Sequence, residues 1–296
     1  MNTSLNQTHN ELLLKVKISA GYFFIISAAS CWGLIGIFSN LAFLEGMKPI
    51  EVGFWRACLA WVCFAVHAVI KKETSFDKKD IPCFLVFSVF GVSLFYISFL
   101  VALKTGGTAF AAVLLYTAPA WVILVALFVY REKLTWVKLM AVLLVIVGVF
   151  LISKKGGSTG SIGAIAILSG LSSGFCYSLY YTMGKYFTKK YSSANLFLYV
   201  LPLGALGMLP FVEFVHKTPT AWASLLAVST ISTFIANYCY YQGLKYLEAG
   251  RASLVATLEP VVAAGTAYIF LGEYFTIPGY LGAVLIIAAV VATIYE

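Results

Sequence analysis

Charged side chains are scarce in this sequence. Asp, Glu, Lys and Arg make up 11% of its 296 residues, whereas hydrophobic residues make up 61%. A water-soluble domain carries about 25% charged residues because its surface faces water. The shortage of charge therefore excludes a soluble globular protein and indicates that most of the surface faces lipid.

The sequence also has few metal-ligating residues and no nucleotide-binding motif. It contains three histidines, and its six cysteines all lie in apolar segments with no Cys-x-x-Cys pair. We therefore predict no metal cluster and no cofactor. The glycine-rich stretch 155–160 lacks the Gly-Lys-Ser/Thr ending of a phosphate loop. Energy for any work across the membrane is expected to come from a gradient or a partner protein.

One pattern resembles the elbow of a serine hydrolase. Gly170-x-Ser172-x-Gly174 matches Gly-x-Ser-x-Gly, but it lies inside one apolar segment, and all three histidines fall near or beyond segment ends. The hydrolase elbow needs a strand before the serine and a helix after it, with a base nearby. We therefore predict that the protein is not an enzyme.

Ten apolar segments follow one another along the chain. A membrane-spanning helix needs roughly 20 apolar residues, and segments without period-2 alternation cannot form a closed barrel. The first segment is too long for the core of a signal peptide. The predicted spans are residues 19–43, 51–70, 82–103, 108–130, 134–153, 161–184, 194–215, 221–244, 251–271 and 276–295.

Basic residues are distributed unevenly between the loops. With the N-terminus in the cytoplasm, 14 of the 20 Lys and Arg residues fall on the cytoplasmic side, five fall outside, and Arg56 lies within a span. Cytoplasmic loops of membrane proteins carry an excess of Lys and Arg. The asymmetry predicts that both termini are cytoplasmic, and it explains the net charge of +8 without any nucleic-acid partner.

The second half of the chain repeats the first. At a shift of 141 residues, Pro119 aligns with Pro260 and Glu132 with Glu273, and at 145 residues Trp32 aligns with Tyr177. Five spans are an odd number, so the second half is predicted to be inverted, as in secondary transporters. The predicted fold is an all-α integral membrane protein with ten transmembrane helices in two inverted five-helix repeats, both termini inside. Its parts are a cytoplasmic tail (1–18), a first repeat (19–153) and a second repeat (161–295).

These residues resemble a known family. The stretch 252–260, ending in Glu259-Pro260, followed by residues 271–273 and 279–282, is similar to the second repeat of the EamA-type drug/metabolite transporter superfamily. The first half is similar through Trp32-Gly33, Arg56, Pro119 and Glu132. The resemblance implies ten helices around a cavity lined by spans 1, 3, 4, 6, 8 and 9, and movement of amino acids or other metabolites, often outward. It also makes a homodimer possible. The first half departs from the second, because it has Ala118 where the second has Glu259.

Two charged residues inside spans are candidates for substrate binding, because charge in a membrane is costly and is usually functional. Glu259 precedes a proline that disturbs the helix, so it could bind a cationic group, take up a proton, or serve as a structural partner of Arg56 or a hydroxyl. Arg56 could receive a carboxylate, reach the outer interface, or pair with Glu51, which we place at the outer rim.

Polar aromatic faces complete the predicted site. Hydroxyl and amide groups facing lipid would lack hydrogen-bond partners, so these faces should turn inward to a cavity. Aromatic rings near a carboxylate could also bind an ammonium group, although aromatic residues form interfacial belts as well. The predicted substrate-binding residues are Glu259, Arg56, Trp32, Tyr96, Tyr116, Tyr177, Tyr181, Asn237, Tyr240 and Tyr241.

The predicted function is alternating-access transport of small organic metabolites across the cell membrane. Amino acids or amine-like solutes are the expected cargo, and export is the expected direction. An uptake carrier for choline-like or other cationic solutes is an alternative. A lipid flippase or a ligand-binding membrane subunit is an alternative of a different class. The expected partners are a small-molecule substrate and the lipid bilayer.

Overall fold

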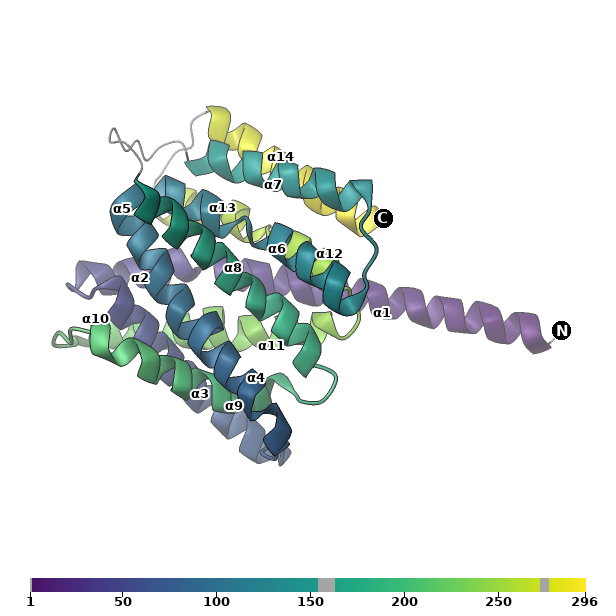
Figure 1. Cartoon of the computed structure of the whole chain (residues 1–296), viewed down its shortest axis with the longest axis horizontal. Coiled ribbons are helices and arrows are strands. Elements are labelled where there is room, and N and C mark those ends of the chain that lie inside the picture. The colour runs from purple at the N-terminus through teal and green to yellow at the C-terminus, as the bar shows by residue number, and fades with distance from the viewer. Residues whose placement is uncertain (1, 154–162, 272–276) are drawn as a thin grey trace.

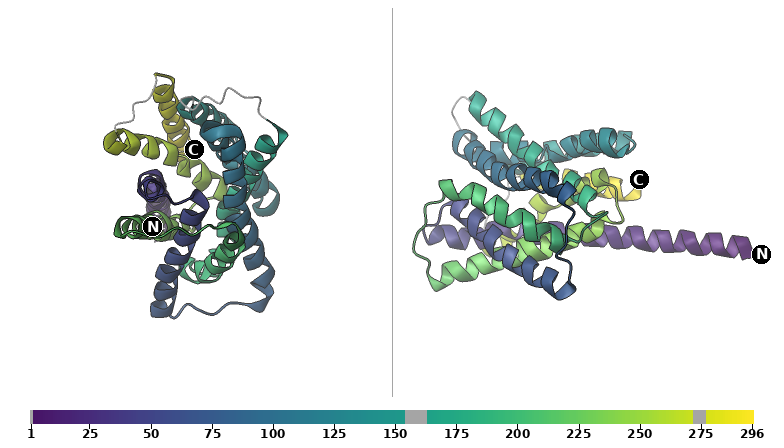
Figure 2. Two further views of the ribbon diagram at one scale, coloured as in Figure 1. Left: turned by 90° about the vertical axis from the view of Figure 1, so that its left-hand side faces the viewer. Right: turned by 60° about the horizontal axis from the view of Figure 1, so that its bottom comes forward.

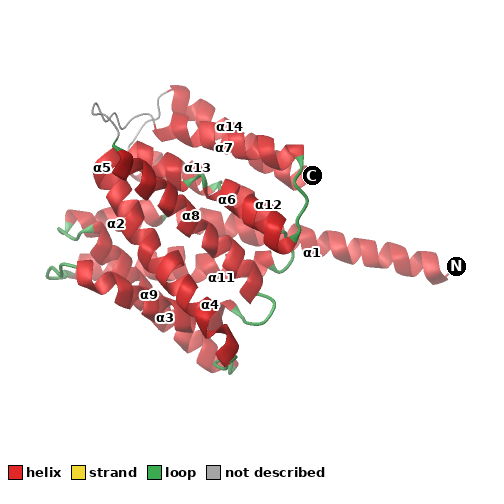
Figure 3. Ribbon diagram, viewed as in Figure 1, coloured by secondary structure: helices red, strands yellow, loops and turns green. Residues whose placement is uncertain are grey.

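The computed structural model describes residues 2–153, 163–271 and 277–296, and this described part is helical without strands (Figure 3). The motif residues Gly272, Glu273 and Thr276 and the stretch 155–160 lie outside it. The α-helices are α1 (Asn2–Gly33), α2 (Ile35–Leu44), α3 (Pro49–Lys71), α4 (Ile81–Val86), α5 (Phe95–Leu115), α6 (Ala118–Val125), α7 (Trp136–Ser153), α8 (Ala164–Phe187), α9 (Ser193–Met208), α10 (Pro219–Ser229), α11 (Ala236–Leu244), α12 (Ala249–Ala256), α13 (Glu259–Leu271) and α14 (Ile277–Tyr295). Three π-helical segments, Phe87–Leu94, Ala126–Tyr130 and Thr230–Ile235, and two short 3₁₀ turns, Lys78–Asp80 and Leu209–Phe211, join or extend them.

Eight helical stretches of the described part are long and apolar enough to cross a membrane. A ninth, Trp136–Ile152, is apolar but shorter, and α8 is long enough but richer in Gly, Ser and Tyr. Large apolar side chains such as Leu281 on α14 and Leu143 on α7 are exposed, as lipid-facing residues are. The chain is thus an all-helical integral membrane protein, while the count of ten spans stays a prediction. The eight stretches are Val16–Leu44, Pro49–Lys71, Lys78–Gly106, Phe110–Tyr130, Ser193–Phe211, Pro219–Leu244, Ala249–Phe270 and Ile277–Tyr295.

Some predicted boundaries differ from those in the structure. The first predicted span is interrupted at Leu34, between α1 and α2. Residues of the predicted tail belong to α1, which begins at Asn2 and extends well beyond the bundle (Figures 1 and 2). Between the predicted spans 82–103 and 108–130, the helix α5 continues with a kink at Gly107, whose positive φ of 84° suits a residue without a side chain.

Helices from the two halves of the sequence pack against each other in pairs. α5 runs along α8, α3 along α9, α1 along α11, and α7 along α14, the last pair forming one side of the bundle (Figure 1). A Cβ atom on Gly148 or Gly282 would clash with the carbonyl of the other glycine, so α7 and α14 approach closely only because both residues are small. The interior is therefore built between the halves rather than within each half.

Two helices break at the same local geometry. The Thr117 carbonyl accepts the N–H groups of the third and fourth residues that follow it, and so does the Leu258 carbonyl. The N–H groups of Thr117 and Leu258 each donate to the carbonyl three residues earlier in the chain. Pro119 and Pro260 then stand near the start of α6 and α13, where a missing N–H costs nothing. Each break places the start of a new helix inside the bundle.

Polar contacts hold the helix ends together. The Glu132 carboxylate accepts the N–H groups of Ala249 (2.9 Å) and Gly250 (3.2 Å), so it caps the start of α12. The Lys138 ammonium lies between Glu132 (4.0 Å) and Glu248 (2.8 Å). This motif glutamate therefore ties the end of the predicted fourth span to the start of the ninth.

A second polar cluster surrounds the Asp80 carboxylate. Lys190 donates to both oxygens at 3.0 Å, and Tyr191 donates at 2.7 Å. The hydrogen bond to Asp80 raises the pKa of the Lys190 ammonium above its usual value. Since Asp80 precedes α4 and Lys190 follows α8, the cluster joins the start of one helix to the end of another.

Candidate functional site

A small cavity of about 60 Å³ lies at the centre of the bundle. It receives side chains from α1, α2, α3, α5, α8, α11 and α13, so both halves of the sequence contribute. Binding pockets for small molecules are commonly about 300–1,000 Å³. The cavity is therefore too small in this conformation for a ligand of usual size. Its lining residues are Trp32, Ile35, Arg56, Phe95, Leu115, Tyr177, Tyr180, Asn237 and Glu259.

Glu259 places a carboxylate on the cavity wall. It is the first residue of α13, immediately after the break at Leu258, and the N-terminal end of a helix favours negative charge. Its Oε2 atom accepts a hydrogen bond from the Tyr177 hydroxyl at 3.0 Å, and the Tyr116 hydroxyl lies near the carboxylate. Glu259 as a residue is only partly buried, and it is among the residues that line the cavity.

Arg56 places a guanidinium group on the same cavity. Its Nε donates to the Thr233 Oγ1 atom at 2.6 Å, and its guanidinium carbon lies 5.8 Å from the centre of the Tyr96 ring. Thr233 belongs to the π-helical segment 230–235, which widens the helix there. A guanidinium has five N–H donors, so the contact with Thr233 leaves donors for an anion.

Arg56 and Glu51 do not form the pair that the sequence suggested as one alternative. Glu51 pairs with Lys217 instead, at 2.5 Å. Nor does Glu51 lie at an open rim, because its side chain has no exposed surface. Arg56 is thereby free of a carboxylate partner among the ion pairs of the described residues.

Asn237 adds an unpaired polar atom to the cavity. The residue is 2% exposed, and its Oδ1 atom has no hydrogen-bond partner among the described residues. A buried acceptor without a partner is costly, because it has lost its contact with water. Beside Asn237, the rings of Trp32 and Tyr177 give the cavity an apolar wall. A ligand with an N–H group would satisfy the amide oxygen.

The structure divides the sequence-predicted residues into three groups. Five line the cavity directly, and two lie one contact away, through Glu259 or Arg56. The remaining three pack behind the cavity. Lining are Trp32, Arg56, Tyr177, Asn237 and Glu259; one contact away are Tyr96 and Tyr116; behind are Tyr181, Tyr240 and Tyr241.

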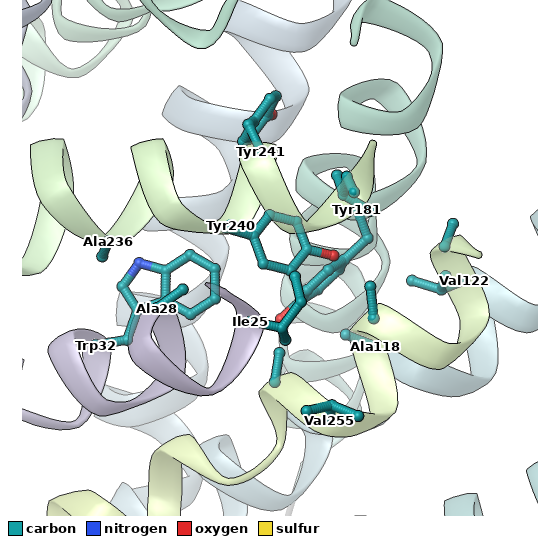
Figure 4. Packing of buried hydrophobic residues seen from close by; sticks show 14 of the residues in the cluster. Ile25, Ala28, Trp32, Ala118, Val122, Tyr181, Ala236, Tyr240, Tyr241 and Val255 are labelled. Atoms are coloured by element: carbon teal, nitrogen blue, oxygen red, sulfur yellow. The ribbon is translucent and has the colours of Figure 1, made fainter. Parts of the chain in front are cut away.

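Tyr240 and Tyr241 have packing roles. The Tyr240 ring has no exposed surface and lies 5.2 Å from the rings of both Trp32 and Tyr181 (Figure 4). Tyr241 points to the other side of α11, where its ring contacts Phe197 at 5.1 Å. In this structure both tyrosines pack behind the residues that line the cavity.

Sequence reasoning missed some residues of the site. Thr233 gave no signal, because a hydroxyl in an apolar span is common and its contact with Arg56 joins distant segments. Tyr180 did give a signal, because it lies three residues after Tyr177 and so on the same face of α8. Phe95 could not be separated from the other phenylalanines by sequence alone.

A comparison with protein families decides the assignment. The model of the EamA-like transporter family matches residues 19–154 and 164–295. The chain belongs to this family. This EamA-like protein is 26% identical over 264 residues to an uncharacterized transporter of Archaeoglobus fulgidus, covering 88% of this chain and 93% of that one. It is 25% identical over 280 residues to the uncharacterized inner membrane transporter YicL of Salmonella typhimurium, covering 90% and 92%.

A solved structure shows the same fold. A protein crystal structure superposes on this EamA-like chain with a TM-score of 0.80 at 14% sequence identity, covering 93% of this chain and 96% of the other. At that identity the likeness speaks for the fold alone. The EamA-like protein is therefore a multi-pass membrane protein of a transporter family, and both matched segments contribute residues to the central cavity.

Proposed function

We propose that the chain is a secondary transporter in the cell membrane that exports small zwitterionic metabolites such as amino acids. The observation that carries the proposal is the presence of the Glu259 carboxylate and the Arg56 guanidinium on one cavity. A zwitterion could place its ammonium group on Glu259 and its carboxylate on Arg56, and both contacts would be charge-assisted. The outward direction rests on the family resemblance.

The proposed mechanism is alternating access between two inverted five-helix repeats. The matching breaks at Thr117 and Leu258 support the repeats, because their hydrogen bonds agree at a spacing of 141 residues. The π-helical segments 87–94 and 230–235 lie at a similar spacing. Discontinuous helices at a central site are common in transporters of this kind. A cavity of about 60 Å³ has to widen before a substrate can enter, as alternating access requires.

A carrier for cationic solutes is the second candidate. The rings of Trp32 and Tyr177 beside Glu259 favour it, since aromatic faces attract ammonium groups. Arg56 speaks against it, because a second positive charge in a cavity this small repels a cation. Uptake of choline-like solutes by such a carrier would leave Arg56 without a ligand partner.

The first experiment is a thermal-shift screen of the purified protein in detergent. The probes are amino acids, primary amines, choline, nucleosides and short-chain phospholipids. A ligand of the folded state raises Tm by mass action. Amino acids should stabilise the wild type much more than Glu259→Gln or Arg56→Gln. Stabilisation by choline that survives Arg56→Gln would favour the cation carrier, and stabilisation by phospholipids alone would favour a flippase.

Transport itself is tested by flux in vesicles of both orientations. A stabilising amino acid should cross the membrane in the wild type, with outward flux favoured, and flux should be lost in Glu259→Gln. Binding without any flux would contradict transport and favour a ligand-binding membrane subunit.

A further inference from the structure

A buried ion pair lies at the end of the bundle that is predicted to face outside. The Lys217 ammonium contacts Glu51 Oε1 at 2.5 Å and donates to the Val215 carbonyl at 2.6 Å. The Glu51 side chain has no exposed surface, and that of Lys217 is 9% exposed. Lys217 lies in the segment between Phe211 and α10, so a loop residue inserts its charged end among helices.

Aromatic rings enclose the same ammonium group. The Lys217 Nζ atom lies 5.3 Å from the centre of the Trp55 ring and 5.1 Å from that of Phe214. The two rings meet edge to face, with their centres 6.1 Å apart. A carboxylate, a carbonyl and two aromatic faces around one position are the features that bind an ammonium ion. We call Glu51, Trp55 and Phe214 the outer cage.

The outer cage has binding capacity that Lys217 does not use. Glu51 Oε2 and Trp55 Nε1 are both buried and have no hydrogen-bond partner among the described residues. Glu51 and Trp55 are four residues apart on α3 and so share one face of the helix. A free acceptor and a free donor on one helix face fit an amino acid, whose ammonium can donate to Glu51 and whose carboxylate can accept from Trp55.

We infer that the outer cage is a second substrate site, specific for the ammonium end of the substrate, and that Lys217 occupies it in place of that group. The inference rests on the proposed function and adds to it a step at the outer end of the pathway. Glu51 precedes Arg56 on α3 by five residues, about 7.5 Å along the helix axis. A substrate ammonium would displace Lys217 from Glu51, and the Val215 N–H, at 3.2 Å, would remain as the contact of the loop with that carboxylate.

Lys217 acts in this scheme as an internal competitor. When a tethered group occupies a site, an outside ligand can bind only while the site is vacant. The apparent affinity is therefore the intrinsic affinity multiplied by the vacant fraction. Removing the lysine should therefore tighten binding of an ammonium ligand. Replacing it by arginine should weaken binding, because the planar guanidinium can bind Glu51 through two parallel hydrogen bonds.

The test measures n-butylammonium binding to the purified full chain by thermal shift, with n-butanol as the uncharged control. All variants carry Glu259→Gln, so that the central cavity does not contribute, and the chain with this change alone is the parent. We expect the apparent affinity to be lowest in Lys217→Arg, intermediate in the parent and highest in Lys217→Met, with at least a tenfold gain for Lys217→Met over the parent. Glu51→Gln should abolish binding both in the parent and in the Lys217→Met variant.

A matched control removes a neighbouring ion pair. Lys48 pairs with Glu213 at the same end of the bundle, but both side chains are exposed. Lys48→Met should therefore leave butylammonium binding unchanged. A merely structural Glu51–Lys217 pair would give no dependence of ligand affinity on the side chain at position 217.

Three outcomes overturn the inference. They are equal affinity in Lys217→Met and its parent, binding that survives Glu51→Gln, and no binding in any folded variant that retains Glu51. If Lys217→Met is too unstable to purify, Lys217→Arg against the parent gives the same comparison. A drop in the stabilisation by amino acids from the wild type to Glu259→Gln tests the central site separately. Either site can therefore fail while the other stands.

Discussion

The two helix breaks have the same backbone hydrogen-bond pattern but carry different side chains. Both use the same hydrogen bonds around Thr117 and Leu258, and both are followed by a proline. After the first break stands Ala118, which is 1% exposed and packs in the core. After the second stands Glu259, which faces the cavity. A helix break of this kind can therefore occur in a purely packed region. The Glu259 carboxylate is what makes the second break a candidate binding site.

The two ends of the bundle show a similar contrast. The third residue of α3 is Glu51, which accepts the Val215 N–H at 3.2 Å and pairs with Lys217. The third residue of α9 is Asn195, which donates to the carbonyls of Glu73 and Ser75, both at 2.8 Å. Each residue ties the start of a helix to a distant loop. Because a neutral amide is sufficient at one end, the charge on Glu51 is not required for tethering.

The largest effect on stability is expected when the ion pair between Glu51 and Lys217, the charged tether, is broken. Lys217→Met leaves the Glu51 carboxylate buried without its partner, which costs about 3–5 kcal/mol. The double variant Glu51→Gln, Lys217→Met should recover much of this loss, because no buried charge remains. Thermal unfolding in detergent measures both. A single variant as stable as the wild type would show that Glu51 is not held as a buried charge.

The next largest effect is expected on ligand binding at the second helix break. Glu259→Gln replaces a charge-assisted contact of about 1.5–3 kcal/mol by a neutral one of about 0.5–1.5 kcal/mol, so Kd should rise about tenfold. Titration with the amino acid found in the screen measures it.

The first helix break supplies the control for this prediction. Ala118→Glu, made together with Glu259→Gln, should not restore binding, because position 118 faces the packed core. Restored binding would mean that a carboxylate at either helix break can bind the ligand.

Loss of the neutral tether, the hydrogen bonds of the Asn195 side chain, should lower the free energy of unfolding less than loss of the Glu51–Lys217 pair. Asn195→Ala removes two hydrogen bonds to loop carbonyls, and each typical bond contributes about 0.5–1.5 kcal/mol. The loss of unfolding free energy should therefore be about 1–3 kcal/mol, with ligand affinity unchanged. A loss of unfolding free energy equal to that of Lys217→Met would show that the charged and neutral contacts contribute equally to stability.

Much of the molecule could be predicted from sequence, and the limits have physical reasons. Long apolar runs identify membrane helices, and the isolated charges Glu259 and Arg56 identify the cavity, because charge inside a bilayer has few other uses. The ion pair between Glu51 and Lys217 joins residues 166 positions apart, and no local pattern encodes such a contact. Helical spacing puts Tyr240 and Tyr241 on a polar face, but it does not tell a cavity wall from a packed aromatic layer behind it.

The smallest effects should separate the wall from that layer. The Tyr177 hydroxyl donates to Glu259, so Tyr177→Phe should weaken substrate binding about 3- to 10-fold. The Tyr240 hydroxyl is buried without a partner among the described residues, so Tyr240→Phe should leave Kd unchanged and leave Tm unchanged or slightly higher. Titration and thermal unfolding of the two variants make a matched pair, since each loses one hydroxyl oxygen. A loss of affinity in Tyr240→Phe as large as that in Tyr177→Phe would place Tyr240 on the cavity wall after all, and the layer behind Trp32 would then belong to the substrate site.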